Sequence, residues 1–208
     1  MDKVDIKRQL KPLYAAPAGR FVLIDVPPLR YFMVDGAGDP NRVPAYRAAV
    51  EALYAVSYTL KFKSKRAGRD YVVPPLQGLW WADDMEDFAR RRKDRWQWSL
   101  MLLVPEFVGP ALAEQAIAEA SAKKAPPPGL RLETLEEGRA VQTLHVGPYD
   151  EEGPLLAKLH SEFLPSQGLA ETGRHHEIYL SDPRKTAPDR LKTLLRQPVR
   201  PLAGLREG

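Results

Sequence analysis

The fold is decided by residues 130–164, LRLETLEEGRAVQTLHVGPYDEEGPLLAKLHSEFL, together with HHEIYLS at residues 175–181. The first part is typical of two short strands around the turn at Glu137-Gly138. An amphipathic helix follows over residues 153–164, because its leucines and Phe163 recur on one helical face. HHEIYLS and RLKTLLRQPV (190–199) favour two further strands, although the second could be helical as far as Gln197. The predicted order is strand–helix–strand–strand.

The first half of the chain repeats this order. Residues 20–34 favour a strand with a bend or bulge at Pro28, since proline cannot donate to a strand ladder. Pro44 to about Phe62 has helical spacing of its apolar residues, and a second helix covers residues 111–125. Between them, YVVPPLQGLWW (71–81) and DRWQWSLMLLVP (94–105) predict strands.

Alignment of the sequences of the two halves suggests an internal duplication of about 80–90 residues, longer than common solenoid repeats. LWWADD (79–84) aligns with IYLSDP (178–183), and SLMLLVP (99–105) aligns with KTLLRQP (192–198). We therefore expect one domain over residues 1–208, with pseudo-repeat halves at about 11–125 and 130–200. Its class is α+β, with tandem β-α-β-β modules, two antiparallel sheets, helices on their outer faces and a central ligand cleft.

Composition narrows the class of protein. The 208 residues carry a formal charge of only +4, and Arg90 to Lys93 are interleaved with acids, so direct nucleic-acid binding is not expected. The absence of cysteine excludes disulfides and thiolate metal sites and fits a reducing compartment. No run approaches the roughly 18 apolar residues of a membrane span, and the first 25 residues lack a signal-peptide core. We expect a soluble cytoplasmic protein that does not bind membranes, and the sequence leaves its oligomeric state open.

The strand HHEIYL places one carboxylate on a definite face. Side chains alternate along a strand, so His175, Glu177 and Tyr179 share one face, while His176 and Ile178 share the other. The Ile178 face is the one expected to pack on a helix. Glu177 would then lie beside Tyr179 in an aromatic cleft, where burial favours proton transfer near neutral pH. The alternative is an ordinary glutamate on a solvated sheet face.

Four tryptophans fall within two neighbouring predicted strands: Trp80, Trp81, Trp96 and Trp98. Tryptophan suits both a core and stacking on planar or cationic ligands. Trp80 and Trp81 must face opposite ways, so at most one of them belongs to the core. Each tryptophan alone favours a core position, whereas the four together favour a ligand cleft.

Other kinds of site are poorly supported. His175 and Glu177 share a face without a third ligand at a sensible spacing, so no metal is expected. His145, in LHVGPYD, is expected to pack or to lie at the rim of the cleft. The sequence has no Walker loop, no GxSxG and no dinucleotide fingerprint, so no cofactor is expected.

Several motifs resemble those of the GyrI-like small-molecule-binding family over about residues 11–199. They are LQGLWWADD, the W-x-W strand at 96–98, LHVGPYDEEGP and HHEIYLSDPRKTAPDRLKTLLRQPV. The chain is most similar to the free-standing subgroup with a Trp-Trp motif, known as cyclopropanoid cyclopropyl hydrolases. The resemblance implies a tandem-module fold around a ligand groove. In relatives fused to transcription regulators, a buried glutamate among aromatic residues senses cationic lipophilic drugs, and Glu177 matches that position.

The resemblance also implies an activity, the opening by water of the strained cyclopropane in cyclopropyl-pyrroloindole toxins that alkylate DNA. Glu177 would deprotonate the water, while Tyr149 would donate a hydrogen bond to the dienone oxygen. The planar aromatic or lipophilic ligand would lie against a set of four residues, namely Trp80, Trp98, Tyr179 and His145. Gln77 departs from the pattern, because many relatives have glutamate there, and this puts a second acid/base group in doubt.

Two other classes of function remain open. A non-enzymatic module could bind or sequester planar, lipophilic or cationic molecules, with Glu177 as the counter-charge. This module needs the same cleft, so the sequence does not separate it from the hydrolase. Inhibition of a protein partner, as by the gyrase inhibitor that names the family, would need an exposed acidic or apolar docking face, and no stretch suggests one.

Overall fold

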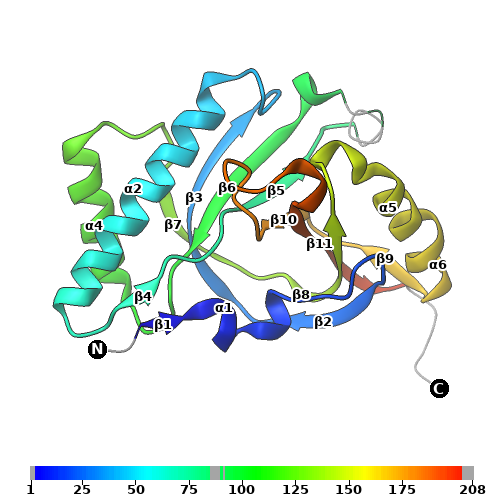
Figure 1. Cartoon of the computed structure of the whole chain (residues 1–208), viewed down its shortest axis with the longest axis horizontal. Helices are drawn as coiled ribbons and strands as arrows, with labels where there is room; N and C mark the ends of the chain where they lie inside the picture. Colours follow the sequence, from blue (N-terminus) through cyan, green and yellow to red (C-terminus); the bar gives the residue numbers. More distant parts are fainter. Residues whose placement is uncertain (1–2, 85–89, 91, 203–208) are drawn as a thin grey trace. The chain divides into compact units, whose positions relative to one another are not determined.

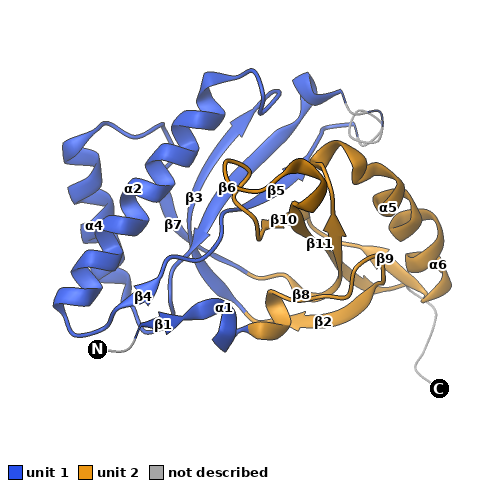
Figure 2. Cartoon of the chain, in the orientation of Figure 1, with its two compact units in different colours: residues 1–10, 28–135 blue, residues 11–27, 136–208 orange. Residues whose placement is uncertain are grey.

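The computed structural model describes residues 3–84, 90 and 92–202. Within them the chain forms two compact units, which Figure 2 distinguishes by colour. Unit 1 comprises residues 1–10 and 28–135, and unit 2 comprises residues 11–27 and 136–208. Arg91, in the basic run near Lys93, lies outside the described residues. No helix in the described part of the chain combines the length and apolar character that crossing a membrane requires.

Unit 1 contains an antiparallel sheet with two long helices (Figure 1). The strand order is β5-β6-β3-β7, and a separate parallel pair is formed by β1 and β4. The bounds are β1 Val4–Asp5, α1 Ile6–Gln9, β3 Leu29–Ala37, α2 Pro44–Arg66, β4 Tyr71–Val72, β5 Gln77–Trp81, the 3₁₀ turn η2 Lys93–Arg95, β6 Gln97–Leu103, α4 Pro110–Lys123 and β7 Arg131–Leu135. Both long helices begin with proline at the first position, where its missing N–H costs no hydrogen bond.

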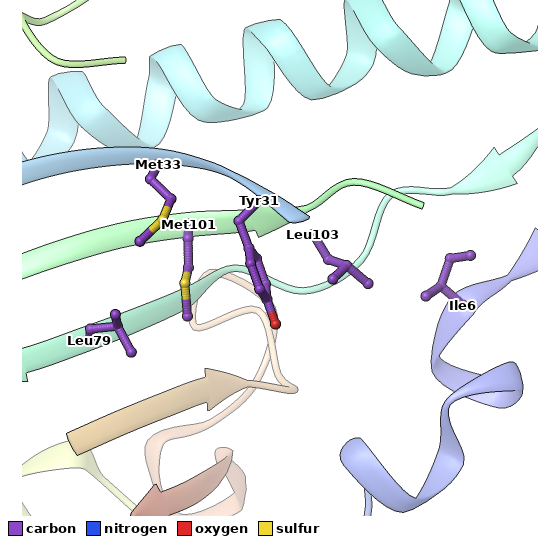
Figure 3. Packing of buried hydrophobic residues seen from close by; sticks show 6 residues of the cluster. All are labelled: Ile6, Tyr31, Met33, Leu79, Met101 and Leu103. Atoms are coloured by element: carbon purple, nitrogen blue, oxygen red, sulfur yellow. The ribbon is translucent and has the colours of Figure 1, made fainter. Parts of the chain in front are cut away.

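The two faces of the unit 1 sheet hold different cores. One face carries a cluster that Figure 3 shows pointing away from α2, made up of Ile6, Tyr31, Met33, Leu79, Met101 and Leu103. The alternate residues Phe32, Val34 and Leu100 are also buried, on the face where Tyr46 of α2 contacts the sheet through Trp98. Both faces are thus apolar, and the sequence reads as nearly continuous hydrophobic runs rather than as alternating strands.

Trp98 occupies the space above a glycine on the neighbouring strand. Gly36 lies directly across from Trp98 in the β3–β6 register. A Cβ added to Gly36 would come within 2.1 Å of the Trp98 ring, far inside van der Waals contact. The ring is completely buried and meets Tyr46 edge-on, with 5.3 Å between the ring centroids. Trp98 is therefore a core residue of unit 1.

We expect Gly36→Ala to lower the free energy of unfolding by about 1–3 kcal/mol, because the methyl group overpacks the Trp98 site. Chemical unfolding followed by tryptophan fluorescence measures the change. Gly109→Ala is the control, since nothing lies within 4 Å of a Cβ at that glycine. Equal stabilities of the two variants would contradict this packing.

Unit 2 contains antiparallel strands with shorter helical segments. Its strand order is β10-β11-β8-β2, and the short strand β9 pairs with the far end of β11. The bounds are η1 Lys11–Leu13, β2 Val22–Val26, β8 Gly138–Val146, η3 Tyr149–Glu151, α5 Gly153–Lys158, the π-helical turn η4 Leu159–Phe163, α6 Leu164–Ser166, β9 Leu169–Glu171, β10 His175–Tyr179, η5 Pro188–Arg190 and β11 Lys192–Pro201. The alternative of a helix up to Gln197 is wrong, because β11 is a strand.

The α+β class and a large antiparallel sheet are confirmed. Each unit has the order strand–helix–strand–strand, and the first of these strands is β3 in unit 1 and β8 in unit 2. In each unit this first strand also pairs with a short strand that is not one of the three. That short strand is β7 in unit 1 and β2 in unit 2. The predicted bend at Pro28 is instead a complete strand break, since β2 and β3 belong to different units. The halves 11–125 and 130–200, as products of a duplication, stay a prediction.

The predicted helix-packing face of β10 is wrong. Glu177 lies across from Leu195, and Leu195 lies across from Thr143, so the three side chains share a face. Val141 and Val199 belong to that same face by alternation, and they pack against Leu159 and Leu164 of the helical segment. The helix therefore covers part of the Glu177 face. On the opposite face, buried polar side chains bind one another. The apolar side chain of Ile178 could not indicate this.

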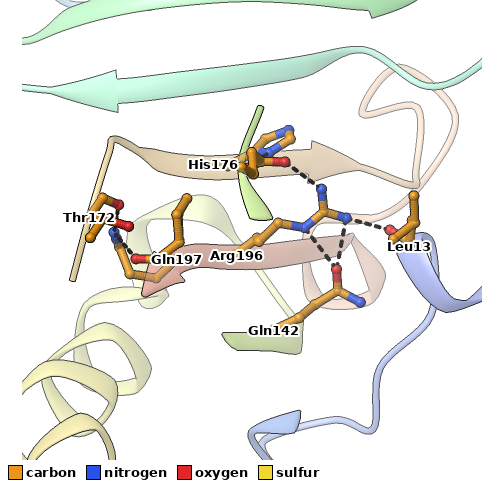
Figure 4. Close-up of polar contacts among 8 residues, drawn as sticks. Leu13, Gln142, Thr172, His176, Arg196 and Gln197 are labelled. Carbon is orange, nitrogen blue, oxygen red and sulfur yellow. Dashed lines mark hydrogen bonds and ion pairs between the residues drawn. The ribbon is translucent and has the colours of Figure 1, made fainter. Parts of the chain in front are cut away.

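A buried polar cluster occupies that opposite face (Figure 4). The guanidinium of Arg196 donates to the Glu137 carboxylate at 2.9 Å, to the Gln142 side-chain oxygen at 2.9 and 3.1 Å and to the Leu13 carbonyl at 2.7 Å. Nδ1 of His176 lies 2.8 Å from the other Glu137 oxygen. Gln142 in turn donates to two backbone carbonyls of residues 12–15. The cluster joins β8, β10 and β11 to the segment that precedes β2.

The charges of this cluster are set by burial and by proximity. Burial alone would raise the pKa of Glu137, but His176 and Arg196 outweigh it and lower that pKa to about 2. Burial lowers the pKa of His176, with Glu137 acting in the opposite direction. We take Arg196 and Glu137 as the ionised pair, because the guanidinium is always charged and holds the carboxylate directly.

Glu137 should make the free energy of unfolding depend on pH. Its pKa is lower when folded, so its contribution is complete above pH 4.5 and disappears as the pH falls toward 2. The shift corresponds to about 3 kcal/mol. Between pH 7 and pH 3, urea unfolding should show a larger loss of stability in the parent than in Glu137→Gln, in which only the other carboxylates titrate. Glu137→Gln should already be weaker at pH 7 because Arg196 loses its counter-charge. The exposed neighbour provides the control as Glu136→Gln, and a Glu137→Gln protein with the parent's pH profile would contradict the pairing.

Candidate functional site

Strand β10 presents a carboxylate and a phenol that bind one another. The Tyr179 hydroxyl donates a hydrogen bond of 2.7 Å to Oε2 of Glu177, as the predicted alternation allows. Nε2 of His175 lies 3.6 Å from the other carboxylate oxygen. Glu177 is 9% exposed, so the alternative of a solvated strand glutamate is wrong. The pair can accept and pass on a proton at a place that bulk water barely reaches.

Tyr149 joins this pair from the turn after β8. Its ring meets the Tyr179 ring edge-on, with 5.7 Å between the centroids. Burial, followed by the negative charges of Glu152 and Glu177, raises the pKa of Tyr149 to about 12. The phenol therefore keeps its proton at neutral pH and can donate it in a hydrogen bond.

His145 holds the turn that carries Tyr149. Its Nε2 lies 3.0 Å from the carbonyl oxygen of Pro148, and because a carbonyl only accepts, we assign the ring proton to Nε2. Gly147 adopts φ +139°, where a side chain would be strained, and a Cβ there would lie 3.4 Å from His145. The contact gives His145 a positioning role for the turn.

Glu152 is a buried carboxylate that the sequence reasoning missed. It stands just before α5 and is 3% exposed, and its charge acts on Tyr149. Asp150, Glu151 and Glu152 follow one another, and such a run normally indicates a solvated turn. The only available signal was its spacing of three residues from Tyr149, which places the two on the same side of one 3₁₀ turn.

The predicted tryptophans lie together in unit 1. Trp80 and Trp98 are directly opposed across β5 and β6, and Tyr46 of α2 contacts both rings. Trp96 meets Trp80 edge-on at 5.7 Å. Trp81 faces the other way and packs against the Ile6 cluster, as the rule of alternation requires.

The six predicted site residues thus form two groups, one in each unit. Unit 2 brings together Glu177, Tyr179, Tyr149 and His145, while unit 1 brings together Trp80 and Trp98. Gln77 lies on the sheet face opposite Trp80, across from Met101, and its side chain is buried. The described residues contain no group of three or more His, Asp or Glu side chains that could hold a metal ion.

Comparison with solved structures finds relatives that match nearly the whole chain. An uncharacterized conserved protein from Listeria innocua is 40% identical, with a TM-score of 0.83, over 95% of this chain and 100% of its own. A protein described as a hydrolase from Listeria innocua is 39% identical, with a TM-score of 0.81 and the same coverage. The C-terminal domain of EcmrR, at 13% identity and a TM-score of 0.56 over 88% of this chain and 98% of its own, shares the fold alone.

Comparison with curated proteins finds no match. The family described as the GyrI-like small molecule binding domain matches residues 21–200, which include both groups of site residues. A match over that much of the chain, together with 39–40% identity to full-length relatives, determines the family. This protein belongs to the GyrI-like small-molecule-binding family.

Proposed function

We propose that this protein hydrolyses cyclopropanoid genotoxins of the cyclopropyl-pyrroloindole type. The observation that carries the proposal is the Glu177–Tyr179 hydrogen bond beside a protonated Tyr149. A base and a donor are the two groups that such a reaction needs. The relative described as a hydrolase, at 39% identity, supports an enzymatic role in general.

In the proposed reaction, Glu177 accepts a proton from water while the water oxygen bonds to the cyclopropane methylene. The carbon–carbon bond of the small ring breaks, and its electron pair passes through the conjugated ring to the dienone oxygen. Tyr149 donates a hydrogen bond to that oxygen as its negative charge grows. The oxygen then takes up a proton as a phenol, so the net change is the addition of one water molecule.

Glu177→Gln tests the proposed base. The amide can still accept from Tyr179 but cannot take the proton of water, so kcat should fall by about two orders of magnitude or more with KM nearly unchanged. Mass spectrometry of the water adduct of a cyclopropyl-pyrroloindole compound measures turnover. Glu133→Gln, an exposed strand glutamate, is the control. Hydrolysis by Glu177→Gln at the parent rate would remove Glu177 from the mechanism.

The second candidate is a binding module for planar or cationic molecules, favoured by the carboxylates that act on Tyr149. In that case the parent converts no cyclopropanoid compound. Glu177→Gln would then weaken binding of cationic ligands and leave neutral ligands of the same shape unaffected, because only the counter-charge is lost.

The stacking role of Trp80 is tested separately. Trp80→Leu keeps most of the apolar volume at this buried site but removes the flat surface, so planar ligands should bind more weakly by about 1–3 kcal/mol. Titration calorimetry measures the affinity, and circular dichroism checks the fold. Trp81→Leu, on the opposite sheet face, should bind as the parent does. If both variants bind equally well, Trp80 is a core residue.

A further inference from the structure

Two threonine hydroxyls are buried on the sheet face that carries Glu177. Thr193 of β11 is 0% exposed and Thr143 of β8 is 1% exposed. Within residues 3–84, 90 and 92–202, neither Oγ1 atom has a hydrogen-bond partner. Buried side-chain hydroxyls have partners in the large majority of cases, so each of these requires an explanation. Valine would fill the same volume without a polar atom.

The strand register places Thr193 at the centre of the proposed site. Tyr179 lies directly across from it on one side, and His145 lies directly across on the other. Glu177 and Thr143 are its diagonal neighbours, since both are aligned with Leu195 two residues along β11. Diagonal neighbours are about 7–8 Å apart at their backbones and closer at their side chains. One water molecule, with two hydrogen bonds of about 2.8 Å, spans such a gap.

The direct neighbours of Thr193 donate their polar protons to other groups. The Tyr179 hydroxyl donates to Glu177, and the Nε2 proton of His145 is given to the Pro148 carbonyl. Thr193 can therefore donate its hydroxyl proton to a third group. Buried water molecules with about three protein hydrogen bonds are the usual partners of such groups.

We propose that Thr193 and Thr143 hold an ordered water beside Glu177, and that this water is the nucleophile. The second part rests on the proposed hydrolase function. The water accepts from the Thr193 hydroxyl and donates one proton to Thr143 Oγ1 and the other to Glu177. One lone pair of its oxygen stays free to attack the cyclopropane carbon. Glu177 then receives the proton as the carbon–oxygen bond forms, and the two threonines orient the water.

The test uses substitutions that preserve shape. Thr193→Val and Thr143→Val remove only the hydroxyl, and each should lower kcat about tenfold or more with KM nearly unchanged. Thr193→Ser keeps the hydroxyl and should restore most of the rate. Thr134→Val, at an exposed position of β7, is the matched control and should behave as the parent.

A high-resolution crystal structure of the parent should show a water within about 3 Å of Thr193 Oγ1 and of the Glu177 carboxylate, and Thr193→Val should lack it. Absence of that water from the parent would overturn the inference. So would a Thr193→Val protein of higher thermal stability and parental kcat, because the hydroxyl would then be merely unsatisfied.

The outcomes also separate this inference from the proposed function. If Glu177→Gln loses turnover while both valine variants keep it, the water is not held by the threonines and the hydrolase function stands. If the parent hydrolyses no cyclopropanoid compound, the nucleophile role fails together with the hydrolase function. The crystal structure then still tests whether an ordered water is bound beside Thr193 and Glu177.

Discussion

Unit 2 depends on the burial of one positive charge. A guanidinium cannot lose its proton, so Arg196 must find partners for its donors inside the protein. It finds a carboxylate, a side-chain amide and a backbone carbonyl, which come from Glu137, Gln142 and Leu13. Leu13 lies before β2, Glu137 lies immediately before β8 and Gln142 lies within β8. Removing any one of them would leave a buried donor unpaired, so the contacts constrain each other.

This constraint extends to the other face of the sheet. Arg196 lies directly across from His176 and from Gln142, so the cluster fixes the registers of β10 and β8 against β11. A slip of one residue would turn every side chain to the opposite face and bring Glu177 into the ionic cluster. The polar cluster on one face thus determines which carboxylate and which hydroxyls appear on the other. Because side chains alternate between the two faces of a strand, the register that forms the stabilising cluster also positions the residues of the proposed chemistry.

Local patterns in the sequence were sufficient for much of this. Helix α2 and the strands β5, β6 and β10 follow from periodicity and proline positions, and the alternation in HHEIYL correctly paired Glu177 with Tyr179. The pairing of β7 with β3 and of β2 with β8 could not be predicted, because chain neighbours on either side of a turn normally pair with one another. Nor could the helix-covered face of β10, since Arg196 and Glu137 resemble surface residues until their partners are known.

The environment of Tyr149 bears on the choice between enzyme and binding module. A pure counter-charge for a cation needs a carboxylate alone, and a nearby phenol adds little to it. In this protein burial, together with nearby carboxylates, raises the pKa of Tyr149 to about 12, so the group is held as a hydrogen-bond donor at any physiological pH. Groups whose environments separate an acceptor of protons from a donor are typical of acid–base catalysis. The arrangement therefore favours a reaction in which negative charge develops on a ligand oxygen, as it does when a cyclopropyl dienone becomes a phenol.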